Sequence, residues 1–107
     1  MKHVLEIQDN QFQSEVIEQQ GSVIVDFYGA DCVICEAVAG WLDAMEDELT
    51  HPVRKVFLSD PTSPLAQAYH LRGIPTLIRF EDGIEQERLA SQQITLASFR
   101  EFILRTG

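Results

Sequence analysis

Residues 23–35 read VIVDFYGADCVIC, an apolar segment that runs directly into a pair of cysteines. The apolar run contains a single acid, Asp26, and its length and β-branched content predict a buried, central strand. A short Gly-Ala-Asp turn follows, and the apolar residues after the second cysteine recur at helical spacing, which predicts a helix over residues 33–49. Cys32 and Cys35 are therefore expected at the junction between a central strand and a helix.

Further apolar patterns predict elements on either side of this junction. Strands are predicted over residues 4–7, 53–58, 76–80 and 84–89, and helices over residues 12–19, 64–69 and from 96 onward, after a cap at Thr95. Asp9 or Asn10 is expected to cap the helix over residues 12–19. The alternation of strand and helix in the first half implies right-handed parallel crossovers, whereas Asp82-Gly83 predicts a terminal hairpin. The order predicts an α/β fold, a central mixed sheet with helices on both faces, in a single domain over residues 1–107.

Charge and hydropathy disfavour several classes of function. The chain has 17 acidic and 8 basic side chains and a net charge of −9, which disfavours nucleic-acid binding because phosphate contacts need clustered Lys and Arg. No run approaches the ~18 apolar residues of a membrane span. The first residues, MKHVLEIQDN, are interrupted by Glu6 and lack the apolar stretch of an export signal. We therefore expect a cytosolic protein.

The cysteine content leaves three interpretations open. In the cytosol a CxxC pair is either redox-active or half of a metal site, because structural disulfides are uncommon there. A zinc site needs about four nitrogen or sulfur ligands, and His3, His51 and His70 are not paired with a further cysteine. No metal is therefore expected, and two buried, inert cysteines are the remaining alternative to redox chemistry.

Several segments resemble the thioredoxin family. Residues 25–35 resemble the family's strand with a buried acid that runs into its CxxC active site, and residues 72–76, Arg-Gly-Ile-Pro-Thr, resemble its cis-proline loop. Residues 80–83 are similar to its terminal hairpin and residues 99–103 to its last helix. The match follows essentially the whole chain in order, so it implies the thioredoxin fold and a thiol–disulfide oxidoreductase that reduces protein disulfides.

The resemblance implies roles for three side chains. Cys32 is expected to be the nucleophile, because a helix N-terminus favours a thiolate, and Cys35, one turn on, is expected to resolve the mixed disulfide. Asp26 should have a raised pKa, since burial disfavours the charged form of a carboxyl group. The matching acid of the family assists proton transfer to the resolving cysteine. The alternative for Asp26 is a side chain that reaches solvent or caps a neighbouring turn.

A second group of residues is expected to contact the substrate. The resemblance implies a cis bond between Ile74 and Pro75, beside which the Ile74 backbone can pair with an extended substrate segment. The expected substrate contacts are Asp31, Val33, Ile34, Gly73, Ile74, Pro75 and Gln92. We expect no cofactor other than the redox-active disulfide of the two cysteines, a reductase as electron donor, no nucleic-acid or membrane partner, and a monomer.

Four positions depart from the family pattern. Asp31 stands in place of a tryptophan, Val33-Ile34 in place of Gly-Pro, Glu36 in place of a lysine, and Gln92 in place of a glycine. Two like charges ~6 Å apart at an effective dielectric of about 20 repel by roughly 3 kcal/mol before screening, so Asp31 and Glu36 should make Cys32 a poorer thiolate. Together the four changes favour a protein with a narrower range of partners than a general thioredoxin.

The cation beside the buried acid is also expected to be missing. By alignment, the lysine of the family falls at Val56, and the side chain of Lys55 should then point to the other face of the sheet. Asp26 would lack a cationic partner, which would raise its pKa further.

Two functions other than disulfide reduction remain open. One is a binding or assembly module that uses the groove at Ile74-Pro75 and the acidic surface with little redox turnover. The other is a redox sensor whose affinity for a partner changes with the oxidation state of Cys32 and Cys35. The reduction potential sets the direction of electron flow, and no sequence pattern specifies it.

Overall fold

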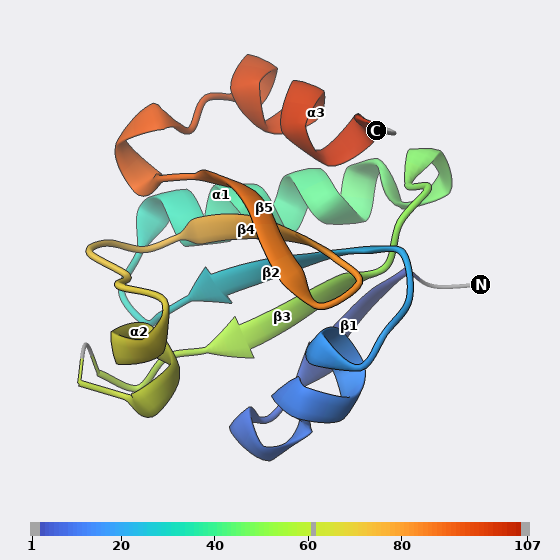
Figure 1. Ribbon diagram of the computed structural model, residues 1–107. Helices are drawn as coiled ribbons and strands as arrows, with labels where there is room; N and C mark the ends of the chain where they lie inside the picture. Colours follow the sequence, from blue (N-terminus) through green and yellow to red (C-terminus); the bar gives the residue numbers. More distant parts are fainter. Residues whose placement is uncertain (1–2, 61, 106–107) are drawn as a thin grey trace.

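A five-stranded sheet in the order β1-β3-β2-β4-β5 runs through the centre of the computed structural model, which describes residues 3–60 and 62–105 (Figure 1). The strands are β1 (Val4–Ile7), β2 (Ser22–Tyr28), β3 (Val53–Phe57), β4 (Thr76–Glu81) and β5 (Ile84–Leu89). β2 lies in the middle, parallel to β3 and antiparallel to β4, while β1 is parallel to β3 at one edge. The predictions of a mixed sheet and of a central strand that leads to the cysteines are confirmed.

Helical segments cover both faces of this sheet, as predicted (Figure 1). They are the 3-10 turn η1 (Asp9–Gln11), the π-helix η2 (Gln13–Ile17), α1 (Val33–Ala44), the 3-10 turn η3 (Glu46–Glu48), α2 (Pro64–Ala68), the 3-10 turn η4 (Ser91–Gln93) and α3 (Leu96–Leu104). α1 and α3 contribute to the apolar core on one face, and η2 and α2 to the core on the other.

The alternation of side chains along β2 separates these two cores. Val23, Val25 and Phe27 belong to the core beneath η2 and α2, and Ile24 belongs to the core beneath α1 and α3. Because successive side chains of a strand point to opposite faces, Asp26 lies on the α1 face with Ile24. Within the buried stretch of β2, residues 23–27, Asp26 is thus the one polar side chain.

Two helix predictions were wrong in extent. The segment predicted as one helix over residues 12–19 is instead η1 followed by η2, and Asp9 and Asn10 lie inside η1 rather than at a helix cap. The helix predicted over residues 33–49 ends at Ala44, and η3 follows. Three consecutive acids form η3, and negative charge is unfavourable at a helix C-terminus, which accounts for the early end.

The predicted terminal hairpin and the cap of the last helix are confirmed. Asp82 and Gly83 have positive φ values of 52° and 82°, as a tight hairpin turn of the mirror-image type requires. The backbone N–H of Ser98 donates to the Thr95 hydroxyl oxygen at 3.1 Å, so Thr95 caps α3.

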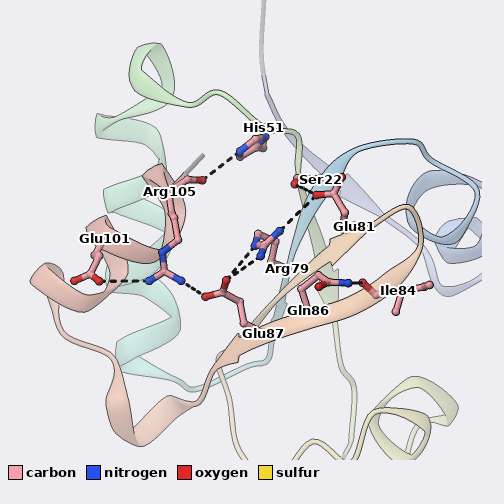
Figure 2. Close-up of polar contacts among 9 residues, drawn as sticks. All are labelled: Ser22, His51, Arg79, Glu81, Ile84, Gln86, Glu87, Glu101 and Arg105. Atoms are coloured by element: carbon pink, nitrogen blue, oxygen red, sulfur yellow. Dashed lines mark hydrogen bonds and ion pairs between the residues drawn. The ribbon is translucent and has the colours of Figure 1, made fainter. Parts of the chain in front are cut away.

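An ion-pair network joins the end of α3 to the sheet (Figure 2). The side chain of Arg79 on β4 is 12% exposed and pairs with Glu87 at 3.0 Å and with Glu81 at 3.5 Å. Arg105, which follows α3, pairs with Glu87 and, at 3.4 Å, with Glu101. Partial burial acts to raise the pKa of Glu87, but the hydrogen bonds and charges of Arg79 and Arg105 lower it overall. The network therefore favours α3 in its position over the α1 face.

Candidate active site

The two cysteines lie where the central strand meets α1. β2 ends at Tyr28, and the chain turns through Asp31, which has a positive φ of 52°. Cys32 is the N-cap residue of α1, and its Sγ accepts a hydrogen bond from the backbone N–H of Cys35 at 3.1 Å. Their Cα atoms are 5.2 Å apart, and the two residues form a disulfide. An N–H group of the first helical turn is therefore directed at the sulfur of Cys32, where it would stabilise a thiolate.

The two sulfur-bearing residues differ in exposure. Cys32 is half-buried, whereas Cys35 is buried with 5% of its surface exposed. Val33 and Ile34 between them are 80% and 42% exposed. Of the two, Cys32 is thus the one that a large partner can approach, and it is framed by apolar surface.

The loop that contains Pro75 lies beside Cys32. The Ile74–Pro75 bond is cis, as the resemblance implied. The carbonyl oxygen of Ile74 lies 3.8 Å from Cys32 Sγ. A Cβ atom at Gly29 would lie 2.6 Å from Cδ1 of Ile74, so the absence of a side chain at Gly29 lets the two loops approach each other.

Two cavities are lined by residues of this loop. One, of about 410 Å³, is lined by residues that include Asp31, Asp60, Gly73 and Ile74. The other, of about 400 Å³, includes Gly73 and Gln92. The structure therefore brings Asp31, Gly73 and Ile74 together around one cavity, whereas Gln92 lines the other, and the exposed Val33 and Ile34 line neither.

Asp26 lies in the sheet on the face covered by α1. It is 1% exposed, and neither of its carboxyl oxygens has a hydrogen-bond partner among the described residues. Burial raises its pKa to about 7, while the charge of Lys55 lowers the pKa and that of Glu6 raises it. The prediction of a buried carboxyl group with a raised pKa is confirmed, and the alternative of a solvent-exposed or capping Asp26 is wrong.

The prediction that Asp26 lacks a cation is wrong. Lys55, and not Val56, is the cross-strand neighbour of Asp26 on β3, so the two side chains share a face. Val56 packs instead in the core on the opposite face. The alignment by sequence was displaced by one residue, and a displacement by one reverses the face of every side chain in a strand.

Sequence reasoning also missed two side chains near Asp26. Glu6 on β1 pairs in register with Lys55 on β3. The hydroxyl group of Tyr28 donates a hydrogen bond to Glu6 at 2.7 Å, and the Lys55 ammonium lies 4.7 Å from the centre of the Tyr28 ring. The signal that could have found them is the alternation of side chains within β1, β2 and β3, once the parallel pairing of these strands is known.

Neither a metal site nor a membrane span is found in the part of the chain that the structure describes. No group of three or more His, Cys, Asp or Glu side chains in residues 3–60 and 62–105 could hold a metal ion. Among the same residues, no helix has the length and apolar character needed to cross a bilayer.

Replacing Asp26 by asparagine should stabilise the fold, and more so at high pH. The pKa of Asp26 is raised to about 7 in the folded state. Between about pH 4 and 7 the Asp26 carboxyl group therefore keeps its proton in the folded protein, whereas the same group has lost its proton in the unfolded chain. Stability therefore falls across this window, and above it the wild type contains a buried charge that accepts no hydrogen bond from the described residues. We expect Asp26→Asn to increase the free energy of unfolding by roughly 2–4 kcal/mol at pH 8.5 and by much less at pH 4, measured by urea unfolding. An equal effect at the two pH values would contradict the burial argument.

Comparisons with known proteins support the resemblance. The thioredoxin family model matches residues 3–105. Thioredoxin C-2 of Corynebacterium nephridii is 35% identical over 95 residues, which is 85% of this chain and 87% of that protein. The thioredoxin of Pseudomonas aeruginosa is 30% identical over 83 residues, which is 77% of each chain.

A solved structure agrees with the sequence comparisons. A mutant thioredoxin from Halobacterium salinarum superposes with a TM-score of 0.78 at 26% identity, over 94% of this chain and 88% of the other. The family model, the relatives and a cysteine pair at disulfide distance lead to one conclusion. The chain belongs to the thioredoxin family and is a thiol–disulfide oxidoreductase.

Proposed function

We propose that the chain reduces disulfides in other proteins, with Cys32 as the nucleophile and Cys35 as the resolving thiol. The single observation that carries this order is the N–H group of Cys35, which donates to Cys32 Sγ at 3.1 Å. A thiolate on Cys32 is stabilised by this bond and by the N-terminus of α1. The greater exposure of Cys32 supports the same order, because a protein disulfide must reach the attacking sulfur.

The proposed reaction has two exchange steps. The Cys32 thiolate attacks one sulfur of the substrate disulfide, a bond forms between them, and the other substrate sulfur leaves as a thiolate that takes up a proton. Cys35 then loses its proton and attacks Cys32 Sγ, which forms the Cys32–Cys35 disulfide and releases the second substrate thiol. The dithiol thus transfers two electrons to the substrate, and an external reductase must return them.

Asp26 is proposed as the group that exchanges the proton of Cys35. Cys35 and Val38 lie three residues apart on α1, and Val38 packs in the same core as Ile24 of β2. Asp26 is the next residue along that face of β2, towards the end of the strand from which the active-site loop leaves. With a pKa of about 7, this carboxyl group can both accept and return a proton near neutral pH.

The proposed substrate site is centred on the Ile74 carbonyl group. This group lies beside Cys32 Sγ and can accept a hydrogen bond from an extended substrate segment, as in strand addition. Contacts are proposed for Asp31, Val33, Ile34, Gly73, Ile74, Pro75 and Gln92. The acidic and apolar surface formed by Asp31, Glu36, Val33 and Ile34 supports a range of partners that is narrower than that of a general thioredoxin. We further propose a monomer that works in the cytosol without any cofactor beyond its disulfide, and without nucleic-acid partners.

Replacement of Cys35 by serine should trap a substrate. The Cys32 thiolate still attacks, but no thiol remains to release the mixed disulfide. We expect Cys35→Ser to accumulate a covalent adduct with a disulfide-containing protein or peptide, detected by non-reducing electrophoresis and mass spectrometry. Cys32→Ser is the matched control and should form no adduct and show no turnover.

A Cys35→Ser variant that captures neither a protein nor a small disulfide would contradict the proposed order of the cysteines. If a Cys32→Ala/Cys35→Ala variant also kept its partner binding and its cellular function, the binding-module interpretation would replace the reductase interpretation.

The acids beside Cys32 should favour cationic substrates. Two disulfide peptides that differ only in Arg or Glu beside the cysteine should be reduced at rates that differ by about tenfold at low ionic strength, with the Arg peptide faster. High salt should reduce this ratio, as should Asp31→Asn/Glu36→Gln. Asp43→Asn/Glu101→Gln removes the same charge at exposed positions outside the proposed substrate contacts and is the control. Equal rates for the two peptides would contradict charge selection.

A further inference from the structure

Three charged side chains of alternating sign form one row across the sheet. Glu6 on β1 is in register with Lys55 on β3, and Lys55 is in register with Asp26 on β2. Directly opposed residues on neighbouring strands share a face, so the row lies on the α1 face. Glu6 is exposed, Lys55 is half-buried and Asp26 is buried. The ammonium-bearing side chain in the middle therefore has a carboxyl group on each side, that of Glu6 in solvent and that of Asp26 in the core.

The Lys55 ammonium group contacts an aromatic ring and not the inner carboxyl group. Its Nζ lies 4.7 Å from the centre of the Tyr28 ring, within the range of a cation–π contact. Neither oxygen of Asp26 accepts a hydrogen bond within the described residues, so Lys55 does not donate to the inner carboxyl group. The charge of Lys55 thus lowers the pKa of Asp26 without a direct hydrogen bond between the two side chains.

The Tyr28 ring is itself held in place by contacts at its polar end and at its side. Its hydroxyl group donates to Glu6 at 2.7 Å, and the Phe57 ring contacts it edge-on with centroids 5.5 Å apart. Burial, and then the hydrogen bond to Glu6, raise the pKa of Tyr28, so its hydroxyl group remains protonated and able to donate. Glu6 therefore orients the Tyr28 ring that the Lys55 ammonium group contacts.

We propose that Glu6, through its hydrogen bond to Tyr28, is a positioning residue that holds the Lys55 ammonium group away from the Asp26 carboxyl group. Without this restraint, Lys55 can approach Asp26 and pair with its ionised form. Glu6 and Tyr28 thereby control how readily the buried carboxyl group holds a proton. The consequence for turnover rests on the proton-exchange role proposed above for Asp26, whereas the restraint itself does not.

The other charged groups near the α1 face are either exposed or held in ion pairs, so none of those named below takes the place of Lys55 beside Asp26. α1 and α3 cover the face, and their charged side chains are exposed: Glu36, Asp43, Arg100 and Glu101. On β4, Arg79 lies on the same face, but Glu81 and Glu87 hold it. Among the described residues, Lys55 and Glu6 are the two whose charges shift the pKa of Asp26.

The test is the titration of Asp26, followed by the carboxyl carbon resonance of the reduced protein in NMR. Glu6→Gln should move the midpoint of Asp26 to lower pH by about half a unit or more, because a like charge is removed and Lys55 is released. Tyr28→Phe keeps the ring and both charges but breaks the hydrogen bond to Glu6. A downward shift in Tyr28→Phe, smaller than that in Glu6→Gln, is the result that only positioning produces.

Glu15→Gln is the matched control, because Glu15 pairs with Arg54 at 3.1 Å and Arg54 alternates with Lys55 on the opposite face of β3. The proposal is overturned if Tyr28→Phe titrates like the wild type, since Glu6 would then act only by its own charge. It is also overturned if Glu6→Gln shifts Asp26 no more than Glu15→Gln does. Urea unfolding confirms that each variant is folded.

The pH profile of mixed-disulfide resolution separates this proposal from the proposed function. If the Asp26 midpoint and the rate profile shift together in Glu6→Gln, both are supported. If the Asp26 midpoint shifts while the rate profile stays in place, the positioning role of Glu6 stands and the proton-exchange role of Asp26 fails.

Discussion

The hydrogen bond from the Cys35 N–H group to Cys32 Sγ depends on β2 ending where α1 begins. β2 is long, apolar and central, so its end is fixed by neighbours on both sides, and the turn at Asp31 places Cys32 at the cap of the helix. Unpaired N–H groups at a helix start favour negative charge. The rest of the site is arranged around a sulfur that this junction holds in place.

The site contains groups of different exposure. On the open side lie Asp31 and Val33, which are exposed, and the half-buried Ile74, whose carbonyl oxygen lies 3.8 Å from Cys32 Sγ. On the inner side lie Cys35 and Asp26, which water does not reach. An attack on a protein disulfide needs an accessible sulfur, and the proton exchange proposed for Asp26 needs a buried carboxyl group with a raised pKa. Residues 29–32 join the end of β2 to α1 (Figure 1), and one helical turn then separates Cys32 from Cys35.

Local patterns predicted most of this arrangement, and long-range pairing explains where they failed. The alternation of elements, the Asp82-Gly83 hairpin and the Thr95 cap rest on neighbouring residues, and all three are confirmed. The partner of Asp26 depends on the register of β3 against β2, and an alignment displaced by one residue assigned Lys55 to the wrong face. Glu6 and Tyr28 were missed because their contact joins strands that are not adjacent in the sheet.

Cys32 and Cys35 are proposed to interconvert reversibly between dithiol and disulfide and to deliver electrons to protein disulfides. A glutathione redox titration of the purified protein, read by thiol alkylation and mass spectrometry, tests this proposal most directly. We expect one two-electron transition with a potential near that of a reducing thioredoxin, about −270 mV. A potential near −120 mV, typical of a strong oxidant, would reverse the direction of electron flow, and the absence of any reversible transition would contradict the redox account altogether.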